Sequence, residues 1–108
     1  MKKTISLNEK ELTFQTNGGL PRLYRLLTGG DIFQDIQKLT GENPLANGGM
    51  EILENLAFAM YHSANPQSNE TIEEWLSQFG TFQLVEMLPD IIELWEEETE
   101  TKSPPNDN

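Results

Sequence analysis

The chain opens with two short runs, residues 4–7 and 12–14, in which apolar and polar residues alternate around a polar centre at residues 8–11. Alternation with a period of two, interrupted by polar residues, predicts a β-hairpin over about residues 3–15. A two-stranded hairpin alone is only marginally stable, so we expect a helix to cover its apolar face.

Beyond residues 17–19 the apolar residues recur every three or four positions, which is the period of an α-helix. Pro21 suits the first turn of a helix, because its missing N–H costs little there, and the glycine pair at 29–30 ends this helix. Asp31 is a good N-cap for a second helix, with Gln34 completing a capping-box pattern. The apolar positions of these two helices are Leu20, Leu23, Tyr24, Leu27, Ile32, Phe33, Ile36 and Leu39.

A loop at residues 41–49 precedes a third helix, whose apolar stripe is broad enough to predict that it is the most buried, and which ends at residues 65–66. Thr71 and Glu74 form a second capping-box pattern and open a short helix that ends at Gly80. The apolar positions are Met50, Ile52, Leu53, Leu56, Ala57, Ala59, Met60 and Tyr61, then Ile72, Trp75, Leu76 and Phe79.

The last predicted helix begins near Thr81 and contains Pro89, which removes a backbone hydrogen bond and clashes with the carbonyl of Val85. We therefore expect either a kink or a helix restart there. One face carries Leu84, Leu88, Ile91 and Trp95. The opposite side carries, at spacings of three or four, Glu86, Asp90, Glu93 and Glu97.

These patterns predict a mainly α fold, a small single domain over residues 1–98 with about five short helices and an N-terminal β-hairpin. Residues 99–108 are polar and contain two prolines, which predicts a disordered tail. The chain has no cysteine, so disulfides and thiolate metal sites are excluded. No signal-peptide pattern or apolar run of about 20 residues is present, so we expect a soluble cytoplasmic protein that is not secreted.

The net charge is −11, from 7 basic and 18 acidic residues, and no Lys or Arg lies between Lys38 and Lys102. Such a surface repels nucleic acid and anionic lipid, and it favours basic partners or solubility alone. We therefore take the acidic side of the last helix, Glu86, Asp90, Glu93 and Glu97, as the candidate partner-binding face.

Candidate catalytic chemistry is sparse. His62 is the only histidine and lacks neighbours at metal-ligand spacing, and Glu73 and Glu74 point in different helical directions. The three glycine pairs form no phosphate-binding motif and read as turns and helix stops. We expect no enzyme activity, no cofactor and no metal. The aromatic residues Trp75, Phe79, Phe82 and Trp95 are predicted to lie in the core or at its edge, and any exposed one would mark a partner site.

Two segments resemble tail assembly chaperones of long-tailed (siphovirus-type) phages and prophages of Gram-positive bacteria. These segments are IEEWLSQF at residues 72–79, followed by Phe82, and LPDIIELW at residues 88–95. The specific pieces are WL-x-x-F and LP-x-I-x-x-L-W. The hairpin, LENLAFAM at residues 53–60 and the polar tail also lie where this family places them, so the resemblance covers most of the chain.

The resemblance implies a role in virion morphogenesis, in the cytoplasm of the bacterial host. Such proteins are thought to coat the tape measure protein, recruit tail tube subunits and leave before the virion is complete. Many are made in two lengths by a programmed ribosomal frameshift, and this chain would be the short form. The family brings no catalytic residues. Whether the chain forms a homo-oligomer, and whether a longer form exists, stays open.

The alternative hypothesis is an acidic inhibitor that imitates DNA and blocks a host nucleic-acid-binding enzyme. Its support is the net charge of −11. A DNA mimic should spread carboxylates along an extended surface, whereas many of these cluster on helices with well-formed apolar faces.

Overall fold

The computed structural model describes residues 1–7 and 9–100, the side chains of residues 98–100 excepted. The predicted hairpin is confirmed: β1 (Lys2–Leu7) and β2 (Lys10–Gln15) pair antiparallel, with Ile5 opposite Leu12. The turn is shorter than the predicted polar centre, because Lys10 already belongs to β2. Glu9 takes up the turn with a φ of 65°, in the left-handed region that helps reverse a chain tightly.

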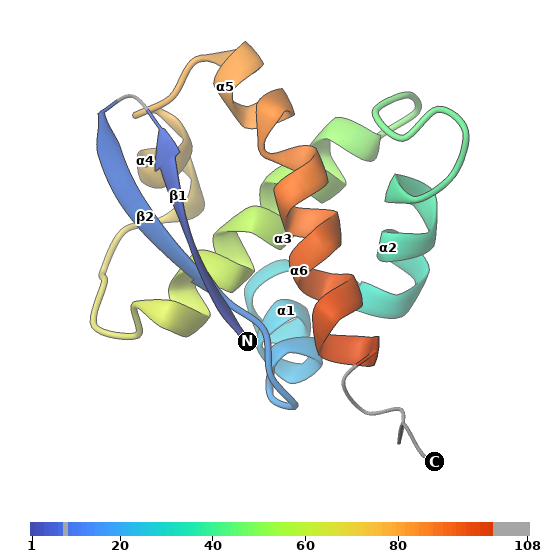
Figure 1. Cartoon of the computed structure of the whole chain (residues 1–108), viewed down its shortest axis with the longest axis horizontal. Helices are drawn as coiled ribbons and strands as arrows, with labels where there is room; N and C mark the ends of the chain where they lie inside the picture. Colours follow the sequence, from blue (N-terminus) through green and yellow to red (C-terminus); the bar gives the residue numbers. More distant parts are fainter. Residues whose placement is uncertain (8, 101–108) are drawn as a thin grey trace.

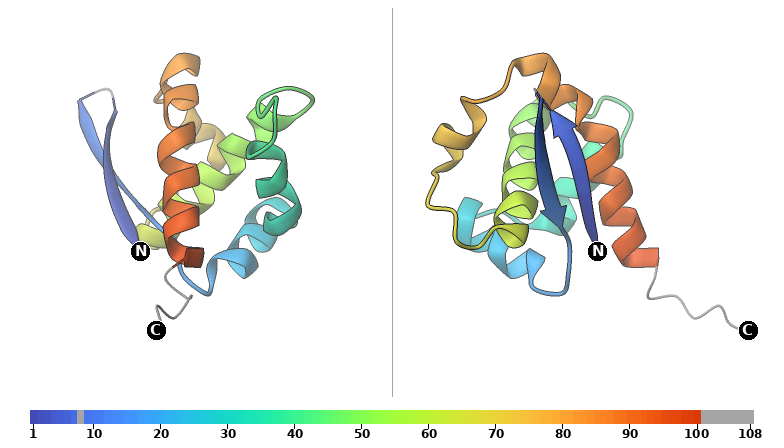
Figure 2. Two further views of the ribbon diagram at one scale, coloured as in Figure 1. Left: turned by 45° about the vertical axis from the view of Figure 1, so that its right-hand side comes forward. Right: turned by 60° about the vertical axis from the view of Figure 1, so that its left-hand side comes forward.

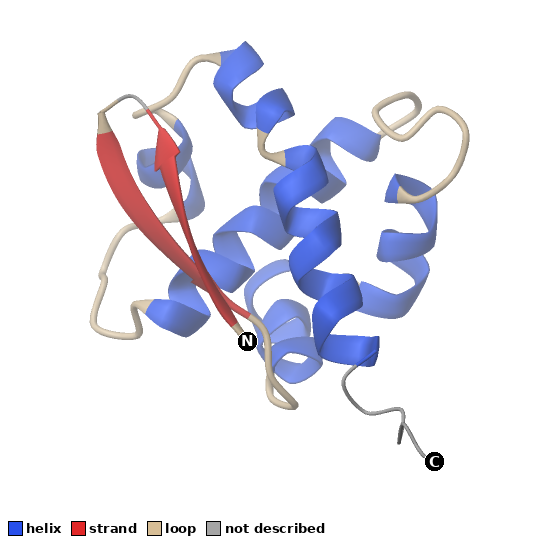
Figure 3. Cartoon of the chain, in the orientation of Figure 1, coloured by secondary structure: helices blue, strands red, loops and turns tan. Residues whose placement is uncertain are grey.

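The helices follow in the predicted order and confirm the mainly α fold (Figures 1 and 3). They are α1 (Leu20–Thr28), α2 (Ile32–Leu39), α3 (Gly49–Ala64), α4 (Ile72–Leu76), α5 (Thr81–Glu86) and α6 (Leu88–Glu100). The last helix extends past the predicted boundary at residue 98. Residues 101–108 lie outside the described residues, so the disorder of the tail stays a prediction.

Capping side chains mark where α4 and α2 begin. Thr71 and Glu74 form the predicted capping box at α4: Glu74 N–H donates to Thr71 Oγ1 at 3.1 Å, and Thr71 N–H donates to Glu74 Oε1 at 2.9 Å. At α2 the capping prediction holds only in part. The carboxylate of Asp31 accepts from Phe33 N–H at 2.9 Å, but within residues 1–7 and 9–100 no return bond from Gln34 completes a box.

Pro89 marks a restart rather than a kink. The break falls at Met87, between α5 and α6, and Pro89 becomes the second residue of α6. At that position its missing N–H has no intrahelical partner to lose, so the ring is accommodated without distorting the helix. The single predicted helix is therefore two helices with different directions, as Figure 1 shows.

Helix α3 occupies the centre of the molecule. It contacts β2 and each of the other helices in the described structure. Figure 2 shows the hairpin on one side of α3 and α6, and α1 with α2 on the other side. The prediction that α3 is the most buried helix is supported by its uninterrupted run of buried residues over 56–60.

Trp75 joins the hairpin to α3. Its side chain is fully buried, and its ring lies 6.2 Å from that of Phe14 in β2. The rings of Phe58 and Tyr61 in α3 lie 5.7 and 5.1 Å away, and that of Phe79 lies 5.1 Å away. These edge-on and tilted geometries are favourable for aromatic pairs. Helix α3 thus covers the apolar face of the hairpin through its contact with β2, as a two-stranded sheet requires, and Trp75 of the short α4 packs against both.

One predicted core or core-edge position is wrong, and two residues of the predicted apolar helix faces are also exposed. Phe82 was predicted to lie in the core or at its edge, but its side chain is 83% exposed. Phe33 and Leu27, assigned to apolar helix faces, are 57% and 38% exposed. Phe79 and Trp95 are partly buried, as predicted for the core edge.

Candidate interaction surface

The four predicted partner-binding carboxylates come from two helices. Glu86 is the last residue of α5, whereas Asp90, Glu93 and Glu97 lie on α6. Glu86 and Glu93 are exposed, and Asp90 and Glu97 are half-buried. The break at Met87 means that the four residues do not form the single helical stripe that their spacing predicts.

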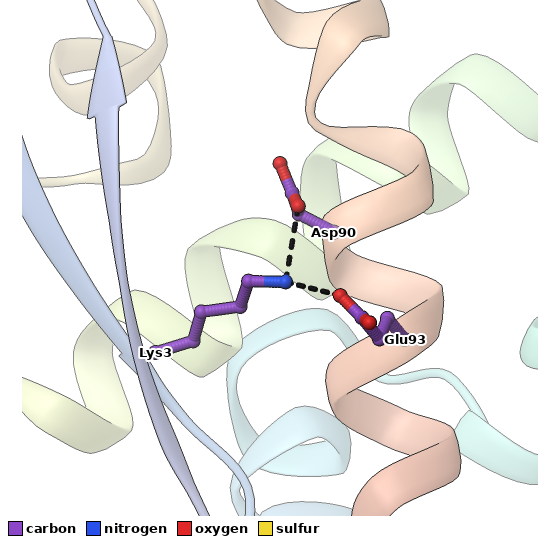
Figure 4. Close-up of polar contacts among 3 residues, drawn as sticks. All are labelled: Lys3, Asp90 and Glu93. Carbon is purple, nitrogen blue, oxygen red and sulfur yellow. Dashed lines mark hydrogen bonds and ion pairs between the residues drawn. The ribbon is translucent and has the colours of Figure 1, made fainter.

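Lys3 in β1 reaches α6 and engages two of these carboxylates (Figure 4). Its ammonium lies 3.1 Å from a carboxylate oxygen of Asp90 and also donates a hydrogen bond to Glu93. The two acids stand three residues apart, so they lie on the same side of the helix. Lys3 of the same chain therefore partly neutralises two of the four predicted partner-binding carboxylates, Asp90 and Glu93.

The ion pairs with Lys3 are sensitive to pH. Hydrogen bonds from Lys3 to Glu93 and to Asp90 raise its pKa above the ordinary value of 10.5. Because the pKa is higher in the folded than in the unfolded chain, the stabilisation is complete below about pH 10.5. It is lost as the pH rises through the higher pKa that Lys3 has in the folded chain. At neutral pH the ion pairs of Lys3 with Asp90 and Glu93, which we call the clamp, are therefore fully formed.

Replacing Lys3 by glutamine is expected to lower the free energy of unfolding by about 0.5–1 kcal/mol, the upper part of the range measured for exposed ion pairs, because Lys3 has two partners. The loss should shrink in 1 M salt, because salt screens exposed charges. Urea unfolding at low and high salt measures both values. Lys2→Gln is the matched control, since Lys2 is exposed on the same strand and makes no ion pair among the described residues. Equal losses in the two variants would contradict the clamp.

Phe82 and Glu86 form what we call the α5 edge. They lie four residues apart on α5 and therefore on one side of it, and both are exposed. Leu84, the buried residue of α5, points the other way. A faint sequence signal exists for this exposure: Phe82 stands two residues before Leu84, which places it across the helix from the core.

The remaining candidates for chemistry do not converge. His62 lies in the last turn of α3 with its ring 6.1 Å from that of Phe58, in an edge-on contact. Across residues 1–7 and 9–100 no three His, Cys, Asp or Glu side chains are grouped so as to hold a metal ion. None of the helices in that part of the chain has the length and apolar character needed to cross a membrane.

The surface feature with the clearest binding character is thus the α5 edge, which joins a protruding aromatic ring to a carboxylate that no described cation neutralises. Comparison with known proteins adds nothing to this picture: no family model, no curated protein and no solved structure matches the chain.

Proposed function

We propose that this protein is a tail assembly chaperone, which binds the tape measure protein and recruits tail tube subunits in the host cytoplasm, and which the mature virion lacks. The observation that carries the proposal is the exposure of Phe82. This residue belongs to the segment that resembles the family, and 83% of its side chain is exposed beside Glu86. Phe82 is the most exposed large hydrophobic side chain among the described residues, and aromatic side chains are common anchors of interfaces.

The chemistry of the α5 edge suits such a client. A tape measure protein is long and helical, with apolar stripes that aggregate when uncovered. Phe82 can pack on an apolar stripe while Glu86 meets a basic side chain next to it. The high negative charge of the chaperone keeps the coated client soluble. One aromatic ring and a few charges give a weak contact, which tube subunits can displace.

Coexpression with the tape measure protein of the same phage or prophage tests the proposal. The wild-type chain is expected to keep the tape measure in solution and to elute with it. Phe82→Ser should reduce the recovered complex at least about tenfold, because an anchor aromatic at an interface often contributes more than 1.4 kcal/mol. Leu26→Ser is the matched control, since Leu26 is another apolar side chain, 72% exposed, but lies on α1.

Two results would contradict the proposal. One is a tape measure that is equally soluble without this protein, with no complex on the column. The other is a complex that survives Phe82→Ser and Leu26→Ser alike, since the α5 edge would then have no role.

The DNA-mimic alternative has less support in the structure. A mimic presents carboxylates to a basic partner, but Asp90 and Glu93 are turned to Lys3 of the same chain. It predicts tight binding to a basic nuclease or repressor that weakens steeply with salt. Titration of such an enzyme with the purified chain, at two salt concentrations, separates the two hypotheses.

A further inference from the structure

A hollow of about 300 Å³ lies where α1 meets α2. It is lined by Pro21, Arg25, Ile32, Phe33 and the turn at residues 29–31. Proline, isoleucine and phenylalanine give it apolar walls, and Phe33 is 57% exposed there. We call this feature the arginine hollow. Its volume is at the lower end of sites that hold small organic groups, which suits one inserted side chain.

The arginine hollow lies beside two basic side chains of an otherwise acidic protein. The only charged residues of α1 are Arg22 and Arg25, which are exposed and lie on adjacent positions of the helix surface. Neither makes an ion pair with any residue in the described ranges. Asp31 also lines the hollow, but its carboxylate caps α2 by accepting from Phe33 N–H. Two guanidinium groups are therefore available to an outside carboxylate.

The α5 edge and the arginine hollow lie at opposite ends of α6. Glu86 stands two residues before α6 begins, whereas Phe33 of the hollow packs edge-on against Trp95, in the second half of α6, at 5.7 Å. Figure 1 shows α5 beyond one end of α6 and α1 at the other end. With 1.5 Å of rise per residue, α6 spans about 20 Å, so one chain cannot bring its own α5 edge to its own hollow.

We infer that the arginine hollow receives the α5 edge of a second copy of this chain. Phe82 of one copy enters the hollow of the next, and its Glu86 forms a charge-assisted hydrogen bond with Arg25 or Arg22 there. The chain itself supplies the partner with the required chemistry, an exposed aromatic side chain one helical turn from a carboxylate. Because the two contacting faces differ, the contact is head-to-tail and can repeat from copy to copy.

The contact must be weak and short-ranged. Each copy carries a net charge of −11, so two copies repel one another at low salt. At about 0.15 M salt the screening length is roughly 8 Å, so attraction between the two contacting faces outweighs repulsion between the net charges of the two copies. One aromatic anchor and one or two ion pairs are typical of interfaces that form transiently. The association does not rest on the chaperone role, but a client that binds Phe82 would compete with it.

Sedimentation velocity of the purified chain at about 0.15 M salt, over a range of concentrations, tests the inference. The wild-type chain is expected to associate reversibly. Arg25→Gln should weaken association at least about tenfold, since its guanidinium meets the carboxylate. Lys2→Gln changes the net charge equally on an exposed strand position and should leave association unchanged. Far-UV circular dichroism checks that each variant is folded.

A mixing experiment tests the head-to-tail geometry. Arg25→Gln keeps an intact α5 edge, and Phe82→Ser keeps an intact hollow. Each variant should be close to monomeric alone, and an equimolar mixture should form a dimer with the wild-type contact affinity. A mixture that stays monomeric while the wild type associates would overturn the inference. So would a wild-type chain that is monomeric at every concentration, or equal behaviour of Arg25→Gln and Lys2→Gln.

The two proposals fail separately. Arg25→Gln removes self-association but leaves the α5 edge free for the tape measure protein. A variant that still holds the client in solution would support the chaperone role whatever the sedimentation result. Loss of client binding together with normal self-association would count against the chaperone role alone.

Discussion

Replacing Trp75 by alanine is expected to lower the free energy of unfolding by about 3–5 kcal/mol, the range found when a large aromatic side chain is removed from a core. The side chain is fully buried and its ring meets those of four other aromatic residues. A domain of this size has only about 5–15 kcal/mol in total. The substitution should therefore bring the protein near its unfolding threshold at room temperature.

The indole nitrogen refines this expectation. Nε1 of Trp75 is buried without a hydrogen-bond partner, and such a group opposes folding by about 1–3 kcal/mol. Trp75→Phe removes this unfavourable group as well as part of the ring. It is therefore expected to be clearly milder than Trp75→Ala, because the two effects on stability have opposite signs.

Urea unfolding followed by circular dichroism measures these differences. Phe82→Ala is the matched control, because Phe82 is an aromatic residue of the neighbouring segment with its side chain 83% exposed. Its free energy of unfolding should stay within about 0.5 kcal/mol of the wild type. Similar losses for Trp75→Ala and Phe82→Ala would contradict the assignment of Trp75 to the core.

The features that could be predicted from the sequence are those set by neighbours along the chain. The capping box at Thr71 and Glu74 needs only four consecutive residues, so its pattern identifies it. The alternation in β1 and β2 fixes which strand residues are buried, because a pleated strand has a period of two. The burial of Trp75 follows from its place on the apolar side of α4.

Phe82 shows why a local pattern misses part of the surface. Its spacing from Phe79 is that of one helical face, but α4 ends at Leu76 and α5 begins at Thr81. The chain changes direction between them, so the two aromatic residues do not share a face. The direction of α5 is set by its contacts with α3 and α6, which no short window of sequence contains.

The partner of the acidic face was equally hidden from the sequence. Lys3 and Glu93 are 90 residues apart, and only the packing of β1 against α6 brings them together. Charge counting treats Asp90 and Glu93 as free carboxylates, whereas the fold gives them an internal cation. The surface left for partners therefore shifts from the middle of α6 towards Glu86 and the exposed ring beside it.

The glycine pair at 48–49 illustrates a third limit. The interpretation as a turn holds for Gly48, which has a φ of 91°, a conformation that side chains rarely adopt. Gly49 has a different reason to be glycine. It is the first residue of α3, it is buried, and the carbonyl of Pro44 lies against it. A close approach of backbone to backbone leaves no mark in a local pattern.

Gly49→Ala is expected to lower the free energy of unfolding by about 1–3 kcal/mol, the usual cost of an overpacked site. Helix propensity alone predicts the opposite, a gain of up to about 1 kcal/mol for alanine over glycine. The steric clash decides the sign of the change in the free energy of unfolding. A Cβ atom on Gly49 would overlap the carbonyl oxygen of Pro44, and backbone rather than a flexible side chain would have to move.

Gly41→Ala separates the clash from the propensity. A Cβ atom there would lie 3.5 Å from the Lys38 carbonyl oxygen, which is an ordinary contact. The free energy of unfolding of this variant, measured in urea, should therefore equal or slightly exceed that of the wild type. The effect of Gly49→Ala should also be local. It should speed hydrogen exchange in the loop at residues 41–48 and at the first turn of α3 more than in the hairpin. A Gly49→Ala protein as stable as Gly41→Ala would show that the loop can withdraw freely from α3, and the packing of Pro44 against the helix start would then have no part in holding the fold.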